Sequence, residues 1–126
     1  MTLKSLKLFL QSEFSRFNAS IFKSDLANLR ISTRKNNEYR GEFIGEHRYG
    51  PIIFITQYQQ FSKTPWPKKY LRYTLIHEMI HYYLWSKNIN EDPPHNRIFQ
   101  QWHKEIFNLP YKKQSRNLYF LTRKDY

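Results

Sequence analysis

Residues 67–86 constrain the fold of this 126-residue chain more than any other segment, because their pattern requires a long helix covered on most sides. Pro67 suits the first turn of a helix, where its missing backbone donor would have no partner. Apolar side chains recur on opposite sides of this helix, at Ile76, Met79 and Tyr83 and, flanking the other side, at Tyr70, Leu84 and Trp85. Such a helix is buried, so neighbouring elements must pack around it.

Shorter patterns before this segment predict the elements that cover it. Residues 3–17 carry apolar side chains at spacings of three and four, which is typical of an amphipathic helix. Residues 29–34 and 39–45 alternate apolar with polar side chains around a turn at 36–37, which predicts a hairpin. Residues 52–56 are almost continuously apolar, which indicates a strand with both faces covered. We expect these strands to form a small antiparallel sheet.

A second helix is predicted after the long one. Asp92 is its expected N-cap, and Pro93 suits its first turn. Apolar residues then follow at helical spacing, and His95 lies on the same stripe as Phe99. The second helix would therefore carry His95 on the side that packs against the long helix.

Together these elements predict an α+β fold in a single domain. The domain is expected to span residues 1–110, with an N-terminal helix, a three-stranded antiparallel sheet and two later helices. A chain of this length can bury one hydrophobic core without disulfides. Residues 111–126 form a basic, Tyr-rich tail, in which residues 118–121 are predicted as a short strand of the same domain.

Charge and cysteine content limit the partners and the chemistry. The chain has 21 Lys and Arg against 10 Asp and Glu, a formal net charge of +11, which attracts polyanions such as nucleic acid. It has no cysteine, so only histidines and carboxylates are left to hold a metal. There is no apolar run of about 18 residues, so we expect no membrane span and a cytoplasmic, nucleoid-associated location.

His77-Glu78-Met79-Ile80-His81 is an H-E-x-x-H motif inside the predicted long helix. Residues four apart lie one turn apart on one helix face, so both imidazoles can reach the same tetrahedral zinc ion. Glu78 lies about 100° round the helix from His77 and can take a proton from the attacking water. The motif predicts a zinc-dependent hydrolase, and the alternative is a pair of packing histidines with a surface glutamate between them.

A catalytic zinc site usually has a third protein ligand. The candidates are His95, His103, Glu91, Glu105 and His47. His95 is favoured, because the loop of thirteen residues after His81 is long enough to reverse the chain. His103 lies off the stripe that carries His95, so we expect it on the surface or behind the ligands.

The sequence resembles the SprT-like metallopeptidases, the group that includes Spartan. The resemblance rests on T-L-I-H-E-M-I-H at residues 74–81 and P-H-N-R-I-F at residues 94–99, and it covers roughly residues 5–108. Family members show H-E-M-x-H, then a third His followed by Gly and, three residues further on, an aromatic residue. Phe99 matches that aromatic residue, and Asn96 replaces the usual Gly.

The resemblance implies a zincin-like fold, with zinc on His77, His81 and His95 and with Glu78 as general base. It further implies cleavage of polypeptides near DNA, including repair of DNA–protein crosslinks, with DNA binding acting to license proteolysis. Family members often add a Cys-rich zinc ribbon, which this chain lacks, so any DNA contact must come from the domain itself. We also expect low sequence specificity, with residues 52–56 as an exposed edge strand that pairs with substrate backbone.

Basic residues interleaved with aromatics are candidates for contact with single-stranded or non-specific DNA. One cluster surrounds Trp66 and Tyr70 and contains Lys63, Lys68, Lys69 and Arg72. Another lies in the tail and contains Lys112, Lys113 and Arg116. A third patch, on the predicted hairpin, contains Arg30, Arg34 and Arg40. The alternative for each cluster is a solvated face above core aromatics.

Three functions remain open from the sequence. The first is a zinc metallopeptidase that acts on DNA-associated or DNA-crosslinked proteins. The second is a zinc peptidase unrelated to DNA, and the third is a non-enzymatic, basic nucleic-acid-binding domain. The oligomeric state is not indicated by any pattern in the chain.

Overall fold

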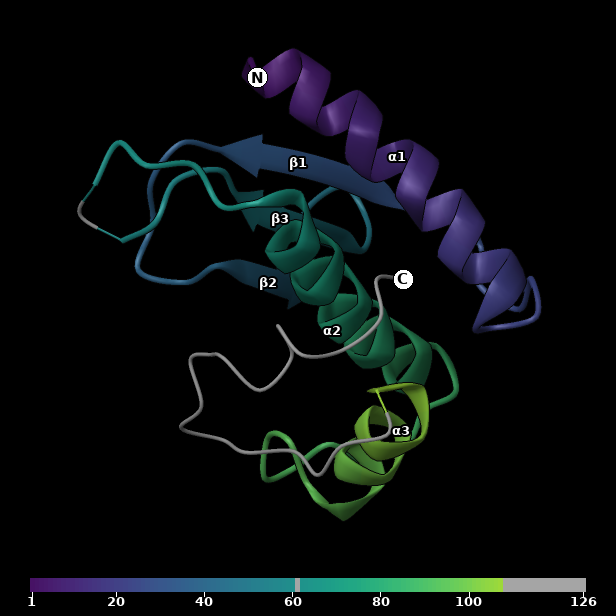
Figure 1. Ribbon diagram of the computed structural model, residues 1–126. Coiled ribbons are helices and arrows are strands. Elements are labelled where there is room, and N and C mark those ends of the chain that lie inside the picture. Colours follow the sequence, from purple (N-terminus) through teal and green to yellow (C-terminus); the bar gives the residue numbers. More distant parts are fainter. Residues whose placement is uncertain (61, 108–126) are drawn as a thin grey trace.

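The computed structural model describes residues 1–60 and 62–107. The elements follow in the order α1 (Leu3–Ser20), β1 (Arg30–Arg34), β2 (Gly41–Ile44), β3 (Ile52–Thr56), α2 (Lys68–Ser86) and α3 (Arg97–Phe107). Figure 1 shows them as a single α+β domain, as predicted. The predicted tail at 111–126, including its strand at 118–121, lies outside the described residues.

The sheet is mixed, so the prediction of an antiparallel sheet is wrong. Its strand order is β1-β3-β2, with β3 parallel to β1 and antiparallel to β2. The predicted hairpin between the first two strands does not form, because β3 lies between them. The continuous apolar run of β3 explains this order, since a strand covered on both faces belongs in the middle of a sheet.

The central position of β3 also removes the predicted substrate edge. Residues 52–56 are paired with neighbours along both edges, so they have no free edge to offer to a peptide. The strands at the two edges of this sheet, within the described residues, are β1 and β2. An extended substrate that pairs with this sheet must therefore use one of those two.

Helices α1 and α2 pack against the same face of the sheet (Figure 1). Helix α1 contacts β1, while α2 contacts β2 and β3. Ile31, Ile53 and Ile55 point into this interface and are buried with the apolar face of α1. Helix α1 runs three residues further than the predicted 3–17, to Ser20.

Helix α2 occupies the middle of the domain, as its pattern predicts. It contacts α1, β2, β3 and α3. Its buried residues span most of its circumference, and they are Leu71, Tyr73, Thr74, Leu75, Ile76, Glu78, Met79, Ile80, Tyr82 and Leu84. The residues of the H-E-x-x-H motif are therefore held by a rigid element that neighbours surround on several sides.

Helix α3 begins at Arg97, so the predicted start at Asp92 is wrong. Asn96 is the N-cap instead: its side-chain oxygen accepts from the backbone N–H of Phe99 (3.2 Å), and its carbonyl accepts from Gln100 (2.9 Å). His95 consequently precedes the helix, in a turn, with a φ of 57°. Among the described residues no helix is long and apolar enough to span a membrane. The cytoplasmic location stays a prediction.

Candidate metal centre

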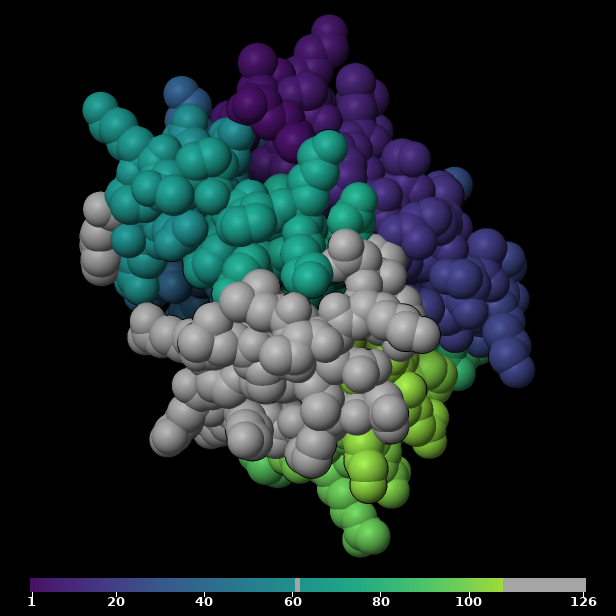
Figure 2. All heavy atoms as spheres, viewed as in Figure 1, coloured from purple at the N-terminus to yellow at the C-terminus, as the bar shows by residue number. Residues whose placement is uncertain are grey.

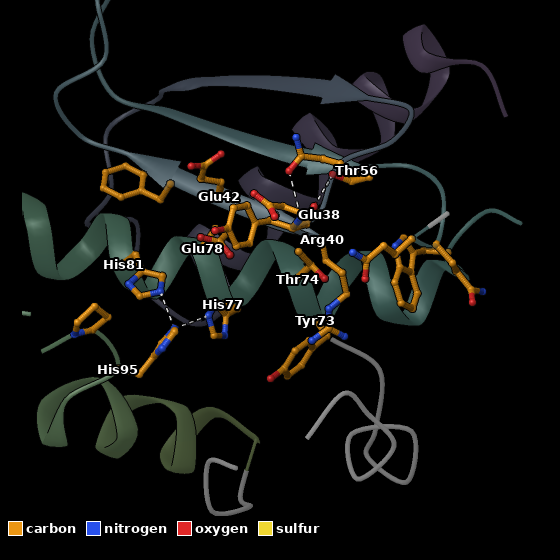
Figure 3. Close-up of a pocket in the computed structure, with 18 of the residues that line it drawn as sticks. Glu38, Arg40, Glu42, Thr56, Tyr73, Thr74, His77, Glu78, His81 and His95 are labelled. Atoms are coloured by element: carbon orange, nitrogen blue, oxygen red, sulfur yellow. Dashed lines mark hydrogen bonds between the residues drawn. The ribbon is translucent and has the colours of Figure 1, made fainter. Parts of the chain in front are cut away.

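Three histidine side chains converge in the cleft beside α2. His77 and His81 lie one turn apart on α2, and His95 faces them from the turn before α3 (Figure 3). Nε2 of His95 lies 3.1 Å from Nε2 of His77 and 3.2 Å from Nε2 of His81. The ligand atoms of these residues all lie within 4.8 Å of one another, so the cluster can hold a metal ion.

The spacing and protonation of these nitrogens fit zinc. For zinc–nitrogen bonds of about 2.0–2.1 Å, a tetrahedral site places its ligand nitrogens about 3.3 Å apart. Burial and then the charges of His81 and His95 hold the pKa of His77 well below its usual value. His77 is therefore neutral, and a neutral imidazole is the form that binds a metal.

The segment around His95 shows why this residue reaches the other two. A positive φ is uncommon outside glycine, although Asn, Asp and His adopt it more often than most residues. The carbonyl of His95 accepts from the side-chain amide of Gln100 (2.8 Å), which ties the turn to α3. The ring of Phe99 packs 4.7 Å from His95 and 4.4 Å from His81, measured between ring centroids. This ring supports both ligands from the side of α3.

Glu91 orients His81. One carboxylate oxygen of Glu91 lies 2.6 Å from Nδ1 of His81, while Nε2 of the same ring faces His95. A carboxylate on the outer nitrogen fixes the tautomer that leaves Nε2 available to the metal. Glu91 is thus a partner of a ligand, whereas the sequence indicated it only as a candidate ligand.

Glu78 lies on the sheet side of the histidine cluster (Figure 3). The side chain is buried, and burial raises its pKa from 4.5 to about 7, against the lowering effect of His81. The backbone N–H of Phe43 donates a hydrogen bond to its carboxylate. Gly41 allows β2 to pack closely against α2. A Cβ at this position would lie 3.3 Å from Cγ of Glu78 and only 2.5 Å from a methyl carbon of Thr74.

A comparison with protein families agrees with this geometry. The model of the SprT-like family matches residues 10–116, which is most of the chain. This protein belongs to the SprT-like family. A comparison with curated proteins gives no match. The particular kinship with Spartan stays a prediction.

The other candidates for the third ligand lie elsewhere in the SprT-like domain. His103 is fully buried, which excludes the predicted surface position, and its Nε2 lies 3.1 Å from the Tyr73 hydroxyl. Its ring centroid is 6.4 Å from that of His77, so it packs behind the ligands. His47 packs against Phe54 at 6.0 Å, on a different face of the sheet, and Glu105 is exposed on α3.

A cleft of about 1110 Å³ runs from the histidines along β2. Aromatic side chains also line it, and they include Tyr39, Tyr58 and Trp66. The guanidinium of Arg40 lies 5.5 Å from the Trp66 ring and 6.0 Å from the Tyr73 ring. The cleft therefore joins the histidines to the residues of β2 in one open volume.

The predicted DNA-contact residues are only partly within the described chain. Lys63 and Lys68 are exposed and Lys69 is half-buried; Figure 2 shows this part of the chain at the surface beside α1. Arg72 lies 3.6 Å from a Glu13 oxygen and 5.5 Å from the Phe9 ring, so it is engaged with α1. The predicted contacts in the tail lie outside the described residues, and they are Lys112, Lys113 and Arg116.

Proposed function

We propose that this SprT-like domain is a zinc-dependent metallopeptidase. The observation that carries the proposal is the convergence of His77, His81 and His95 beside the buried carboxylate of Glu78. Three imidazole nitrogens leave a fourth position of a tetrahedral metal for solvent or substrate. A carboxylate next to that position is the arrangement that metal-assisted hydrolysis of a peptide bond uses.

Glu78 is the general base in this proposal. Zinc, when bound, would lower the pKa of water and polarise the scissile carbonyl. Glu78 then takes the proton of the attacking water, and a pKa of about 7 suits a group that must both accept and release a proton near neutral pH. The Phe43 N–H holds the carboxylate in place, and Glu91 holds the ring of His81.

Strand β2 is the edge on which we place the substrate backbone. Arg40 directly precedes β2, and its carbonyl accepts from the N–H of Thr56 in β3. Every second residue counted from Arg40 therefore turns its backbone groups towards β3. By the alternation of an antiparallel ladder, the N–H and carbonyl of Gly41 then point away from β3 and towards the cleft. Pairing through these main-chain groups would recognise a peptide with little regard to its side chains.

We further propose that the substrates are DNA-associated or DNA-crosslinked proteins. The net charge of +11 and the family support this choice, because a basic domain gathers on polyanions together with the proteins bound there. The alternative is a zinc peptidase with the same metal site whose substrates are unrelated to DNA.

The experiment compares wild type with Glu78→Gln on an unstructured, labelled polypeptide, either free or crosslinked to a single-stranded oligonucleotide. We expect wild type to cleave both and to cleave the crosslinked form faster, with the difference shrinking as salt is raised. Equal cleavage of both forms would leave a zinc peptidase unrelated to DNA. Equal cleavage by wild type and Glu78→Gln would exclude the peptidase.

A further inference from the structure

The face of the sheet opposite α1 and α2 carries an array of arginines and aromatic rings. Residues 31, 53 and 43 point into the core, so their strand neighbours Arg30, Ser32, Arg34 and Phe54 point to the opposite side. The loop after β2 folds back over this outer face, because the ring of His47 packs 6.0 Å from Phe54. Arg40, which the sequence groups with Arg30 and Arg34, instead lines the cleft.

Tyr49 is the most exposed ring of this outer face. It is 67% exposed, and the guanidinium carbons of Arg30 and Arg48 lie 5.6 and 5.2 Å from its centroid. The turn that presents it is closed by the N–H of Gly50, which donates to the carbonyl of His47 (3.0 Å). Gly50 has a φ of 94°, a conformation that glycine adopts without strain. Two cations therefore lie loosely over one ring that stays largely exposed, on a defined turn.

The charges around Tyr49 are unequal. Arg34 lies over Phe54 at 5.0 Å and is paired with Glu42 at 3.3 Å, so these two charges offset each other. Glu46 is exposed at the start of the loop. The two positive charges of Arg30 and Arg48 outnumber the single negative charge of Glu46, and both arginines are exposed. The neighbourhood is therefore positive around an aromatic platform.

We propose that this outer face binds single-stranded nucleic acid, with a base stacked on Tyr49 and phosphates held by Arg30 and Arg48. An exposed ring gives every base a surface to stack on, and flanking arginines neutralise the backbone. Duplex bases are already stacked on each other, so an isolated platform of this kind suits unpaired bases. The outer face lies across the sheet from α2, so a bound strand leaves the metal cleft open.

This inference does not depend on the proposed peptidase function, and binding alone tests it. Anisotropy of a labelled single-stranded oligonucleotide is measured on the full chain between about 50 and 200 mM salt. Tyr49→Ala should weaken binding by about tenfold, and Tyr49→Phe should keep it, since stacking requires the ring and not the hydroxyl. The double variant Arg30→Gln/Arg48→Gln should reduce the slope of log affinity against log salt by about 1.4.

The matched control is Lys4→Gln/Lys7→Gln, which removes the same charge from exposed positions on α1. Thermal unfolding of each variant should match wild type, because all these side chains are at the surface. The proposal is wrong if the α1 control loses as much affinity as the arginine pair, since binding would then follow net charge alone. It is equally wrong if Tyr49→Ala binds like wild type, or if a duplex of the same length binds as tightly as the single strand.

Discussion

The two faces of the small sheet differ in how their charged side chains are surrounded. The cleft face ties its ionisable groups together: the buried Glu78 accepts a hydrogen bond from Phe43, and the half-buried Glu91 contacts His81 at 2.6 Å. The outer face leaves its arginines exposed and pairs them with rings, as Arg48 is with Tyr49. Buried groups shift in pKa and suit chemistry, whereas exposed charges keep their mobility and suit a polyanion.

The largest expected effect is on the cleft face. Glu78→Gln removes the proposed base but keeps the shape of the side chain, so cleavage of a labelled polypeptide should fall by about 10²–10⁴-fold. Zinc content should stay at the wild-type value, because Glu78 is not a ligand. Lys7→Gln, on the exposed face of α1, is the control and should cleave like wild type. Retained cleavage in Glu78→Gln would show that the buried carboxylate of the cleft is not the general base.

The burial of Glu78 should also be visible in stability. Because burial raises its pKa from 4.5 to about 7, the folded chain binds this proton more tightly than the unfolded chain. The stabilisation is complete below pH 4.5 and is lost as the pH rises through about 7. In metal-free protein, wild type should therefore lose on the order of 3 kcal/mol relative to Glu78→Gln between these limits.

Denaturant unfolding of both proteins across this pH range gives the difference. His77 is present in both, and its lowered pKa acts in the opposite sense, so the difference isolates Glu78. A difference that stays constant with pH would mean that Glu78 is not buried in solution.

Glu91→Gln should weaken zinc binding by about 10–100-fold, because the ring of His81 loses a charged partner. Competition with a chelator measures this change. Asp92→Asn removes the same charge from an exposed neighbour and should bind zinc like wild type. Equal effects of the two variants would show that only the net charge of the segment matters.

The smallest expected effect concerns the start of α3. Asn96→Ala removes the N-cap that holds the turn of His95, and it should cost about 1 kcal/mol of unfolding free energy. Asn96→Asp keeps the acceptor for the N–H of Phe99 but loses the amide that donates to the carbonyl of Asn90 (2.6 Å), so it should restore only part of the loss. Chemical denaturation of the metal-free chains compares the three proteins, and an unchanged midpoint for Asn96→Ala would contradict the assignment of the cap.

Local patterns predicted the parts of this structure that depend on local physics. The spacing of His77 and His81 and the apolar periodicity of α2 are properties of one helix, and both hold in the structure. Asn is a common N-cap, so the sequence is also consistent with a helix start at Asn96. The Asp92-Pro93 pair is an equally good signal for the start of α3, and it led to the wrong prediction.

The sheet order and the partner of His81 depend on segments far apart in the chain. Whether β2 pairs with β1 or β3 is decided by which strand needs cover on both sides, and turn residues near Asn36 suggested the wrong answer. Glu91 reaches His81 because the chain reverses direction before His95. No residue pattern predicts the positive φ of His95. Such contacts follow from the assembled fold.

The most direct test of the account is the zinc content of chain purified without chelators, measured for wild type, His95→Ala and His47→Ala. Convergence of three imidazoles predicts about one zinc per chain in wild type and in His47→Ala, and about a tenth of that or less in His95→Ala. Wild type without zinc, or His95→Ala with a full equivalent, would contradict it.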